Sequence, residues 1–313
     1  MHSPKISIVI ATYNSSHLLS YAIQSIINSS FHDWELIVVG DCCTDDTGAV
    51  VKGFNDDRIS FFNLEKNSGQ QAKPNNIGIS KAKGEYLAFL NQDDLFFPDH
   101  LEKCIYEMKE SKADFLIIPG IKILPPGPNG FDPNQIKTDI SSVHPDGKFS
   151  TNVFSVASTW FLKRSVTEKI GQWEMEKDLY YTPSQEWIFR AFQKGIKFNF
   201  PSRVGVMIIL SGERKNSYKK KFSPEHEYFS PRLNDPELKA QMLEQAAIFG
   251  YKKFQEHLFF QPKVLVKRVM GLPLDFILKK LNIHPSSYRF KKRWKKKGKL
   301  IEKVRKDTGL SST

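Results

Sequence analysis

The sequence predicts an α/β fold in which helices flank a mostly parallel sheet. Three apolar runs, ISIVIA at 6–11, ELIVV at 35–39 and YLAFL at 86–90, have the composition of strands buried on both faces. The segment 17–29 between the first two places its apolar residues at helical spacing. A strand, a helix and a strand in close succession form a βαβ unit, and such units build parallel sheets.

The alternation continues along the first part of the chain. Helices are expected at 45–54, 75–83 and 98–111, and strands at 59–64 and 115–118. The second half is less regular, and a stretch rich in Pro, Gly, Asn and Asp is expected to form a long loop at 125–151. The segments expected after it are an apolar aromatic run at 153–162, a helix at 187–194, strand character at 198–209, a polar mobile stretch at 211–236 and a helix at 238–260.

The net charge of +12 is concentrated in the last part of the chain. Residues 261–313 contain 16 Lys and Arg against 3 Asp and Glu, so the remainder is close to neutral. Within this tail, 264–281 alternates apolar and basic residues, and 289–299 (RFKKRWKKKGK) interleaves Phe290 and Trp294 with charge. This pattern is typical of a segment that lies on an anionic membrane surface. Nucleic-acid binding and a solvated helical face are the alternatives.

Several features indicate a cytoplasmic protein. The chain starts without an apolar signal segment and has no run of about 18 apolar residues, so neither secretion nor a spanning helix is expected. The three cysteines, Cys42, Cys43 and Cys104, have no zinc spacing and are odd in number, which favours a reducing compartment.

Polar side chains follow the predicted strands where each strand ends. They are Thr12, Tyr13 and Asn14, then Asp41, then the run Asn91-Gln92-Asp93-Asp94. Ligands of open parallel sheets bind at these carboxyl ends. The chain has no G-x-G-x-x-G and no P-loop motif, so a dinucleotide fold and a P-loop NTPase are disfavoured. Carboxylates repel phosphates unless a divalent cation lies between them, which predicts a metal-assisted nucleotide site.

Four segments in order resemble family 2 glycosyltransferases of the GT-A type. They are ISIVIATYN at 6–14, ELIVVGDCCTDDT at 35–47, NIGISKAKGEYLAFLNQDD at 76–94 and TPSQEWIFRAFQKGIKF at 182–198. The resemblance implies a GT-A domain, a Rossmann-like sheet flanked by helices, over 1–236, with a basic helical extension over 237–313. It also implies an inverting sugar transfer from a nucleotide-diphospho-sugar, a UDP- or dTDP-sugar, in surface polysaccharide or glycolipid assembly.

The resemblance also implies roles for individual residues. Donor binding falls to Thr12 and Tyr13 (base and ribose), Asp41 (base), Lys73, Asn76, Asn91 and Gln92. Asp93, with Asp94 beside it, is expected to bind Mn²⁺ or Mg²⁺, and Glu186 to act as the catalytic base. Trp173 and Trp187 are the expected acceptor contacts. Asn91 stands where the family has the first Asp of its metal triplet, and Gln185 replaces an acid beside the base.

Each of these residues also has a simpler interpretation. The triplet at 12–14 suits an ordinary turn, Asp41 and the pair Asp93-Asp94 suit helix caps, and Glu186 suits a solvated helix surface. Expected partners are the nucleotide-sugar, a glycan or lipid-linked acceptor, the inner membrane face and a second copy in a homodimer. A nucleotidyltransferase and a degenerate nucleotide- or nucleic-acid-binding protein are the alternative functions.

Overall fold

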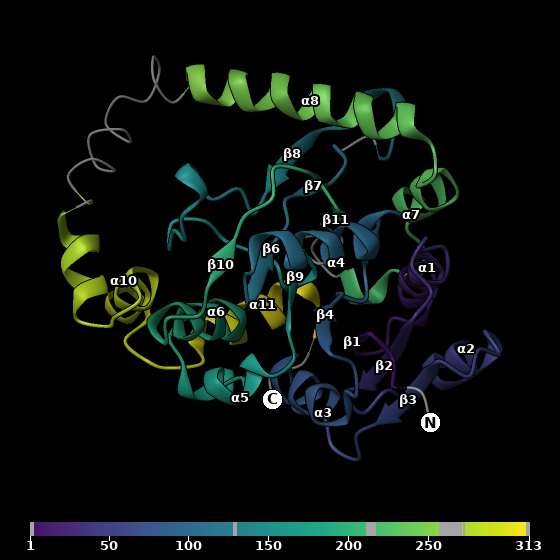
Figure 1. Cartoon of the computed structure of the whole chain (residues 1–313), viewed down its shortest axis with the longest axis horizontal. Helices are drawn as coiled ribbons and strands as arrows, with labels where there is room; N and C mark the ends of the chain where they lie inside the picture. The colour runs from purple at the N-terminus through teal and green to yellow at the C-terminus, as the bar shows by residue number, and fades with distance from the viewer. Residues whose placement is uncertain (1–2, 128–129, 211–216, 257–270, 272, 311–313) are drawn as a thin grey trace.

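The structure is a computed structural model that describes residues 3–127, 130–210, 217–256, 271 and 273–310. Two sheets form the centre of the molecule and helices surround them (Figure 1). The larger sheet has the strand order β10-β6-β9-β4-β1-β2-β3. Its strands are β1 (Ile6–Thr12), β2 (Trp34–Gly40), β3 (Ile59–Asn63), β4 (Tyr86–Phe89), β6 (Phe115–Ile117), β9 (Trp160–Lys163) and β10 (Phe198–Asn199).

The centre of the larger sheet is parallel, as the βαβ pattern predicts. β1 pairs in parallel with both β2 and β4, so that Ile8 faces Leu36 on one side and Ala88 on the other. Only β9 runs antiparallel, between β4 and β6. The carboxyl ends of β1, β2 and β4 therefore meet at one edge of the sheet. The mixed α/β fold with a parallel-rich central sheet is confirmed.

Helices cover both faces of this sheet and bury its apolar runs. They are α1 (Ser16–Ile27), α2 (Thr47–Gly53), α3 (Ala72–Lys81), α4 (His100–Ser111), α5 (Val166–Ile170) and α6 (Pro183–Gln193). Alternate strand residues enter separate cores, Ile8 and Leu36 on one face, Val9 and Ile37 on the other. A Cβ on Gly78 would lie 2.3 Å from Val9 Cγ1, so α3 packs closely on β1 because this position is glycine.

A second sheet with the order β5-β11-β7-β8 lies beside the first. Its strands are β5 (Asp94–Phe96), β7 (Gly120–Ile123), β8 (Thr138–Ser141) and β11 (Val206–Ile209). β8 interrupts the stretch expected to be a loop, where its short polar sequence TDIS carries little strand signal. The strand expected over 198–209 is two strands, one in each sheet, because Pro201 cannot continue a ladder of hydrogen bonds.

Further helices are α7 (Pro224–Phe229), α8 (Pro236–Gln255), α10 (Pro285–Trp294) and α11 (Lys299–Thr308), and residues 273–280 are helical as well. α8 packs on β8 and β7. Residues 211–216 of the expected polar stretch, 257–260 of the expected helix and 264–270 of the expected amphipathic segment lie outside the described residues. Within the described ranges, no helix has both the length and the apolar character needed to span a bilayer.

The basic C-terminal helices fold back onto the body of the protein beside α6 (Figure 1). Gly298 N donates to Leu179 O at 2.9 Å, and Gln193 Nε2 donates to Asn282 O at 2.9 Å. The rings of Tyr181 and Phe290 stack with centroids 5.6 Å apart. These contacts fix α10 and α11 against the segment that leads into α6.

Candidate functional site

A cavity of about 470 Å³ opens at the carboxyl ends of the parallel strands. This size is within the usual range of small-molecule pockets. The predicted residues that line it are Thr12, Tyr13, Asp41, Asn91, Gln92 and Asp93. Strand order explains the grouping, because β4, β1 and β2 are neighbours and each contributes residues at its carboxyl end or just after it. The structure therefore places these six side chains around one cavity.

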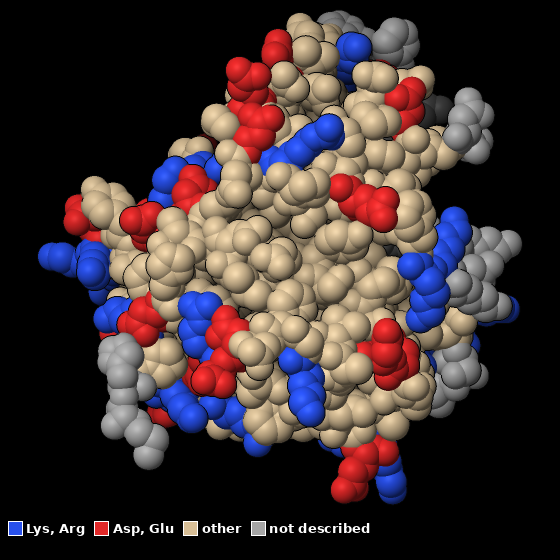
Figure 2. All heavy atoms as spheres, turned by 90° about the vertical axis from the view of Figure 1, so that its right-hand side faces the viewer, with Lys and Arg blue, Asp and Glu red and all other residues tan. Residues whose placement is uncertain are grey.

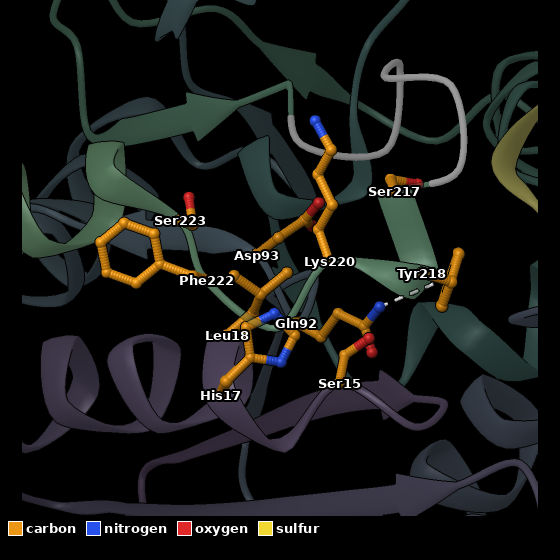
Figure 3. Close-up of a pocket in the computed structure, with 10 residues that line it drawn as sticks. All are labelled: Ser15, His17, Leu18, Gln92, Asp93, Ser217, Tyr218, Lys220, Phe222 and Ser223. Carbon is orange, nitrogen blue, oxygen red and sulfur yellow. Dashed lines mark hydrogen bonds between the residues drawn. The ribbon is translucent and has the colours of Figure 1, made fainter. Parts of the chain in front are cut away.

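Gln92 ties two of the strand ends together. Its Oε1 accepts hydrogen bonds from Thr12 Oγ1 at 2.8 Å and from Tyr13 N at 3.0 Å. Its Nε2 donates to the hydroxyl of Tyr218 at 3.4 Å, the dashed contact in Figure 3. Burial and the nearby Asp93 raise the pKa of Tyr218 to about 12, so this phenol stays protonated. Gln92 thus holds the floor of the cavity in a fixed orientation.

Asp41 organises the loop that forms another wall of the cavity. One carboxylate oxygen accepts from the backbone N and the hydroxyl of Ser68, both at 2.8 Å, and the other accepts from Gly69 N at 2.9 Å. Gly69 has a φ of +89°, a conformation that favours glycine. The oxygen that accepts from Gly69 N has a second lone pair, so Asp41 can hold the loop and still accept from a ligand.

Asp94 lies beneath the cavity and is not among its lining residues. It is 2% exposed, and its carboxylate accepts from Ser158 Oγ at 2.5 Å, from Asn91 Nδ2 at 2.9 Å and from Ile209 N at 3.2 Å. Burial, with the adjacent charge of Asp93, raises its pKa well above the ordinary value, against these hydrogen bonds. In this arrangement Asp94 joins β4 to β11 and does not face a cation in the cavity.

Asp93 is the carboxylate of the triplet Asn91-Gln92-Asp93, and it lines the cavity. Its backbone oxygen accepts from Nε2 of the buried His226 at 2.9 Å, which fixes the peptide. Within the ranges that the structure describes, no three His, Cys, Asp or Glu side chains gather at a metal-binding distance. Mg²⁺ commonly binds one or two carboxylates together with substrate phosphates and water. Asp93 therefore fits a cation that arrives with a diphosphate.

A smaller cavity adjoins the first and shares Gln92, Asp93 and Tyr218 with it. Figure 3 shows its other lining residues, among them Ser15 and His17 at the start of α1 and Lys220. Lys73, which the sequence suggested as the positive charge of the site, is exposed on α3 and does not line either cavity.

Asn76 also lies away from the cavity. Its Oδ1 accepts from Trp173 N at 2.8 Å and its Nδ2 donates to Trp173 O at 3.0 Å. This two-point contact fixes α3 to the segment after α5, 97 residues later in the chain. The amide is thereby engaged with backbone and does not face a donor in this arrangement.

Glu186 lies in the first turns of α6, but its carboxylate points to Arg190. Arg190 Nε donates to Oε1 at 2.9 Å and Nη2 to Oε2 at 2.6 Å. Burial raises the pKa of Glu186, while Arg190 acts to lower it. The residues of this helix end that line the cavity are Thr182, Pro183 and Ser184. The structure therefore brings the helix end to the cavity, but Glu186 is not among the residues that line it.

Trp173 and Trp187 are part of a buried aromatic stack. They are 2% and 0% exposed, and their ring centroids lie 5.5 Å apart, with Trp160 packed on both. All three rings are buried in the core. An acceptor sugar cannot stack on Trp173 or Trp187 in this arrangement. The aromatic residues that do line the cavity are Tyr13, Tyr218 and Phe154, and Phe154 is 49% exposed.

Sequence reasoning missed further lining residues. Tyr218 comes from the polar stretch expected to be mobile, and Ile301, Val304, Arg305, Thr308 and Leu310 come from the C-terminal extension. Nothing in their local sequence points to a ligand site, because they reach the cavity only through long-range packing.

The charges on one face of the molecule bear on nucleic-acid binding. Figure 2 shows the side that carries α1, α2 and α7 in Figure 1. Basic and acidic side chains are interspersed there around a broad uncharged area. A nucleic-acid footprint requires a continuous basic patch. This face therefore does not provide one.

Comparison with known proteins agrees with the geometry. Residues 7–171, more than half of the chain, match the family model for glycosyl transferase family 2. The chain belongs to glycosyl transferase family 2. The matched range contains the strand ends and Asp93, and it ends before Glu186.

Curated relatives share about a third of the matched positions with this family 2 chain. A putative teichuronic acid biosynthesis glycosyltransferase TuaG of Bacillus subtilis is 35% identical over 36% of this chain and 45% of its own length. A GalNAc(5)-diNAcBac-PP-undecaprenol beta-1,3-glucosyltransferase of Campylobacter jejuni is 38% identical over 35% of this chain and 36% of its own. The chain thus spans less than half the length of these relatives.

Solved structures share the fold. Crystal structures of residues 1–349 of TarS of S. aureus, in complex with UDP and with UDP-GlcNAc, superpose with TM-scores of 0.54 and 0.55. The alignment with the UDP-GlcNAc complex covers 82% of this chain and 73% of the TarS chain, at 20% sequence identity. At this identity the likeness establishes the GT-A fold of this family 2 protein and no more.

Proposed function

We propose that this family 2 protein is an inverting glycosyltransferase that moves a sugar from a UDP-sugar to a hydroxyl of a glycan or lipid-linked acceptor, in surface polysaccharide assembly. The observation that carries the proposal is the single cavity shared by Thr12, Tyr13, Asp41 and Asp93. The printed names of the relatives, a teichuronic acid enzyme and an undecaprenol-linked glucosyltransferase, support the acceptor class. The UDP-GlcNAc complex of TarS supports the donor class.

The donor nucleotide is proposed to lie between Tyr13 and the loop held by Asp41. The strand-end backbone and Gln92 orient it, while Asp93 and Lys220 lie on the side of the diphosphate. Mn²⁺ or Mg²⁺, when bound, supplies positive charge that stabilises the departing diphosphate. Asp93 is the residue proposed to hold it. Asp94 supports the site by fixing Asn91 and does not itself bind the cation.

Glu186 is proposed as the general base that takes the proton of the acceptor hydroxyl. The carboxylates that line the cavity among the described residues are Asp41 and Asp93, and both belong to the donor side. Glu186 stands two residues after Ser184, at the helix end that faces the cavity. To reach an acceptor hydroxyl, the Glu186 carboxylate has to leave the two hydrogen bonds that it accepts from Arg190. Direct displacement on the anomeric carbon then inverts its configuration.

Phe154 is proposed to carry the acceptor sugar. Its ring lies at the cavity, is half exposed, and precedes the short helical turn at 157–159 that holds Ser158 under Asn91. Aromatic faces suit the apolar faces of sugar rings. This assignment replaces Trp173 and Trp187 as the proposed acceptor contacts.

The helical residues 273–280 and the basic helices α10 and α11 after them are proposed to rest on an anionic membrane surface, where a lipid-linked acceptor resides. Phe276, Ile277 and Leu281 are 60%, 53% and 62% exposed, and Lys279 and Lys280 lie among them. Basic residues near such a surface contribute about 1 kcal/mol each. Cosedimentation with anionic vesicles and with zwitterionic vesicles tests this, and equal binding to both would contradict it.

The decisive experiment screens a panel of nucleotide-sugars for release of nucleoside diphosphate by the full chain. A UDP-sugar is expected to give manganese-dependent UDP release that rises with an acceptor glycan. A nucleotidyltransferase would instead release pyrophosphate from a nucleoside triphosphate. If no nucleotide-sugar is turned over or bound, the proposed function is wrong.

A further inference from the structure

The C-terminal helix α11 forms a wall of the proposed donor cavity. Five residues of α11 and of the turn after it line the cavity, namely Ile301, Val304, Arg305, Thr308 and Leu310. They share it with Asp93 and with Thr12, which is nearly the whole chain away in sequence. The extension that the sequence suggests as a membrane anchor is thus part of the site.

Arg305 is the charged member of this wall. It is 7% exposed, and its Nη1 donates a hydrogen bond to Gly69 O. Gly69 N in turn donates to Asp41 at 2.9 Å, so the guanidinium lies one peptide unit from the proposed base-binding carboxylate. Its charge also reaches the Asp93 side of the cavity: the pKa of Tyr218, which burial and Asp93 raise, is lowered by Arg305. Arg305 likewise opposes the effect of burial on the pKa of Glu176.

The position of Arg305 is set by packing and not by chance contact of a loose tail. Gly298 caps the start of α11; its φ of +74° favours glycine, and its N–H donates to Leu179 O. Thr308, one turn after Arg305, is 7% exposed. Upstream, the rings of His284 and Phe189 contact at 4.9 Å, which fixes α10 on α6.

A guanidinium in a pocket for a nucleotide has a specific chemical use. It presents five donors in a planar fork that matches the oxygens of a phosphate, and Gly69 O accepts from one of them. The carboxylates that line the cavity, Asp41 and Asp93, are negatively charged and would repel a diphosphate that bound alone. A cation on Asp93 and the guanidinium of Arg305 together would balance it.

We propose that Arg305 binds the diphosphate of the donor, so that α11 completes the donor site. This inference rests on the proposed function, since it assumes a nucleoside diphosphate ligand. It makes the extension a determinant of donor affinity, separate from any role at a membrane. The opposite hypothesis, that α11 occludes the cavity, predicts that substitution of Arg305 strengthens UDP binding.

The test is a calorimetric titration of the full-length chain, with manganese, by UDP and by uridine. Arg305→Gln is expected to weaken UDP binding by about 10- to 100-fold, the loss of a charge-assisted bond. Uridine affinity should change less than twofold. Arg305→Lys, which keeps the charge but not the fork, should give an intermediate loss. Lys306→Gln, on the exposed side of the same helix, is the control and should leave both affinities unchanged.

Salt dependence provides a second measurement on the same proteins. UDP affinity of the parent chain should fall more steeply with salt than that of Arg305→Gln, because one ionic contact is gone. If the parent chain binds no UDP, the proposed function fails. If it binds UDP and Arg305→Gln binds equally well or more tightly, the role of Arg305 is wrong. An equal loss for uridine and UDP also overturns it, since the contact is then with the nucleoside.

Discussion

The Oε1 atom of Gln92 accepts a hydrogen bond from the hydroxyl of Thr12 at 2.8 Å, which joins the end of β4 to the end of β1. The two residues are 80 positions apart, and each directly borders the cavity. A contact between neighbouring strand ends keeps the donor site in one shape before any ligand arrives. Pre-formed sites of this kind bind without the cost of ordering their walls.

Gln92→Ala should weaken UDP binding by about tenfold, because Thr12 Oγ1 and Tyr13 N lose their shared acceptor. Titration with UDP measures the change. Gln24→Ala, which removes an amide that bonds only Asn28 on the surface of α1, is the matched control. UDP affinity equal to that of the parent chain would show that the donor does not depend on this strand-end link.

Asp93 and Asp94 are adjacent, yet their substitution should have different consequences. Asp93→Asn should abolish manganese-dependent turnover and leave the melting temperature nearly unchanged, because this side chain faces the cavity. Asp94→Ala should lower stability by about 2 kcal/mol or more, since donors of Ser158, Asn91 and Ile209 lose their acceptor. Thermal denaturation and UDP release measured on both variants check this. The reverse pattern would make Asp94 the cation ligand.

Glu186→Gln should lower kcat by about 100- to 10,000-fold with little change in UDP affinity, as expected for a lost general base. Glu174→Gln is the control, since its carboxylate is exposed and 4.0 Å from the same arginine. Full activity of Glu186→Gln would remove the residue from the mechanism.

The pH dependence of the reaction reports on the same carboxylate. Burial raises the pKa of Glu186, so the basic form is lost at a higher pH than for an ordinary glutamate, and kcat/KM should fall on the acid side. Arg190 acts in the opposite direction, so Arg190→Gln should move this acid limb to higher pH. If the acid side of the kcat/KM profile does not move in Arg190→Gln, a group other than Glu186 is titrating.

Phe154→Ala should raise the acceptor KM by about 2- to 10-fold, the loss of one aromatic contact, and leave UDP affinity intact. Initial rates at varied acceptor concentration give the value. Tyr106→Ala, at an exposed position on α4, is the control. A change confined to the donor KM would place Phe154 on the donor side.

Local sequence was sufficient to predict the strands and the polar residues at their ends. Thr12, Asp41 and Asp93 follow apolar runs, and parallel pairing alone brings them together. Local sequence was not sufficient to predict that Asp94 is buried and structural, because its hydrogen-bond partners Ser158 and Ile209 lie far along the chain. The buried positions of Trp173 and Trp187 likewise depend on tertiary packing, and so does the placement of Arg305 beside Gly69.

The wall that α11 supplies has a consequence for biosynthesis. Chains emerge from the ribosome with the N-terminal part first, and early segments begin to fold before later ones are made. The parallel strands can pair once residue 90 is exposed, yet the compartment they border stays incomplete until Leu310 has left the exit tunnel. A nascent chain can therefore have the polar residues at the strand ends in place before α11 closes the cavity around them.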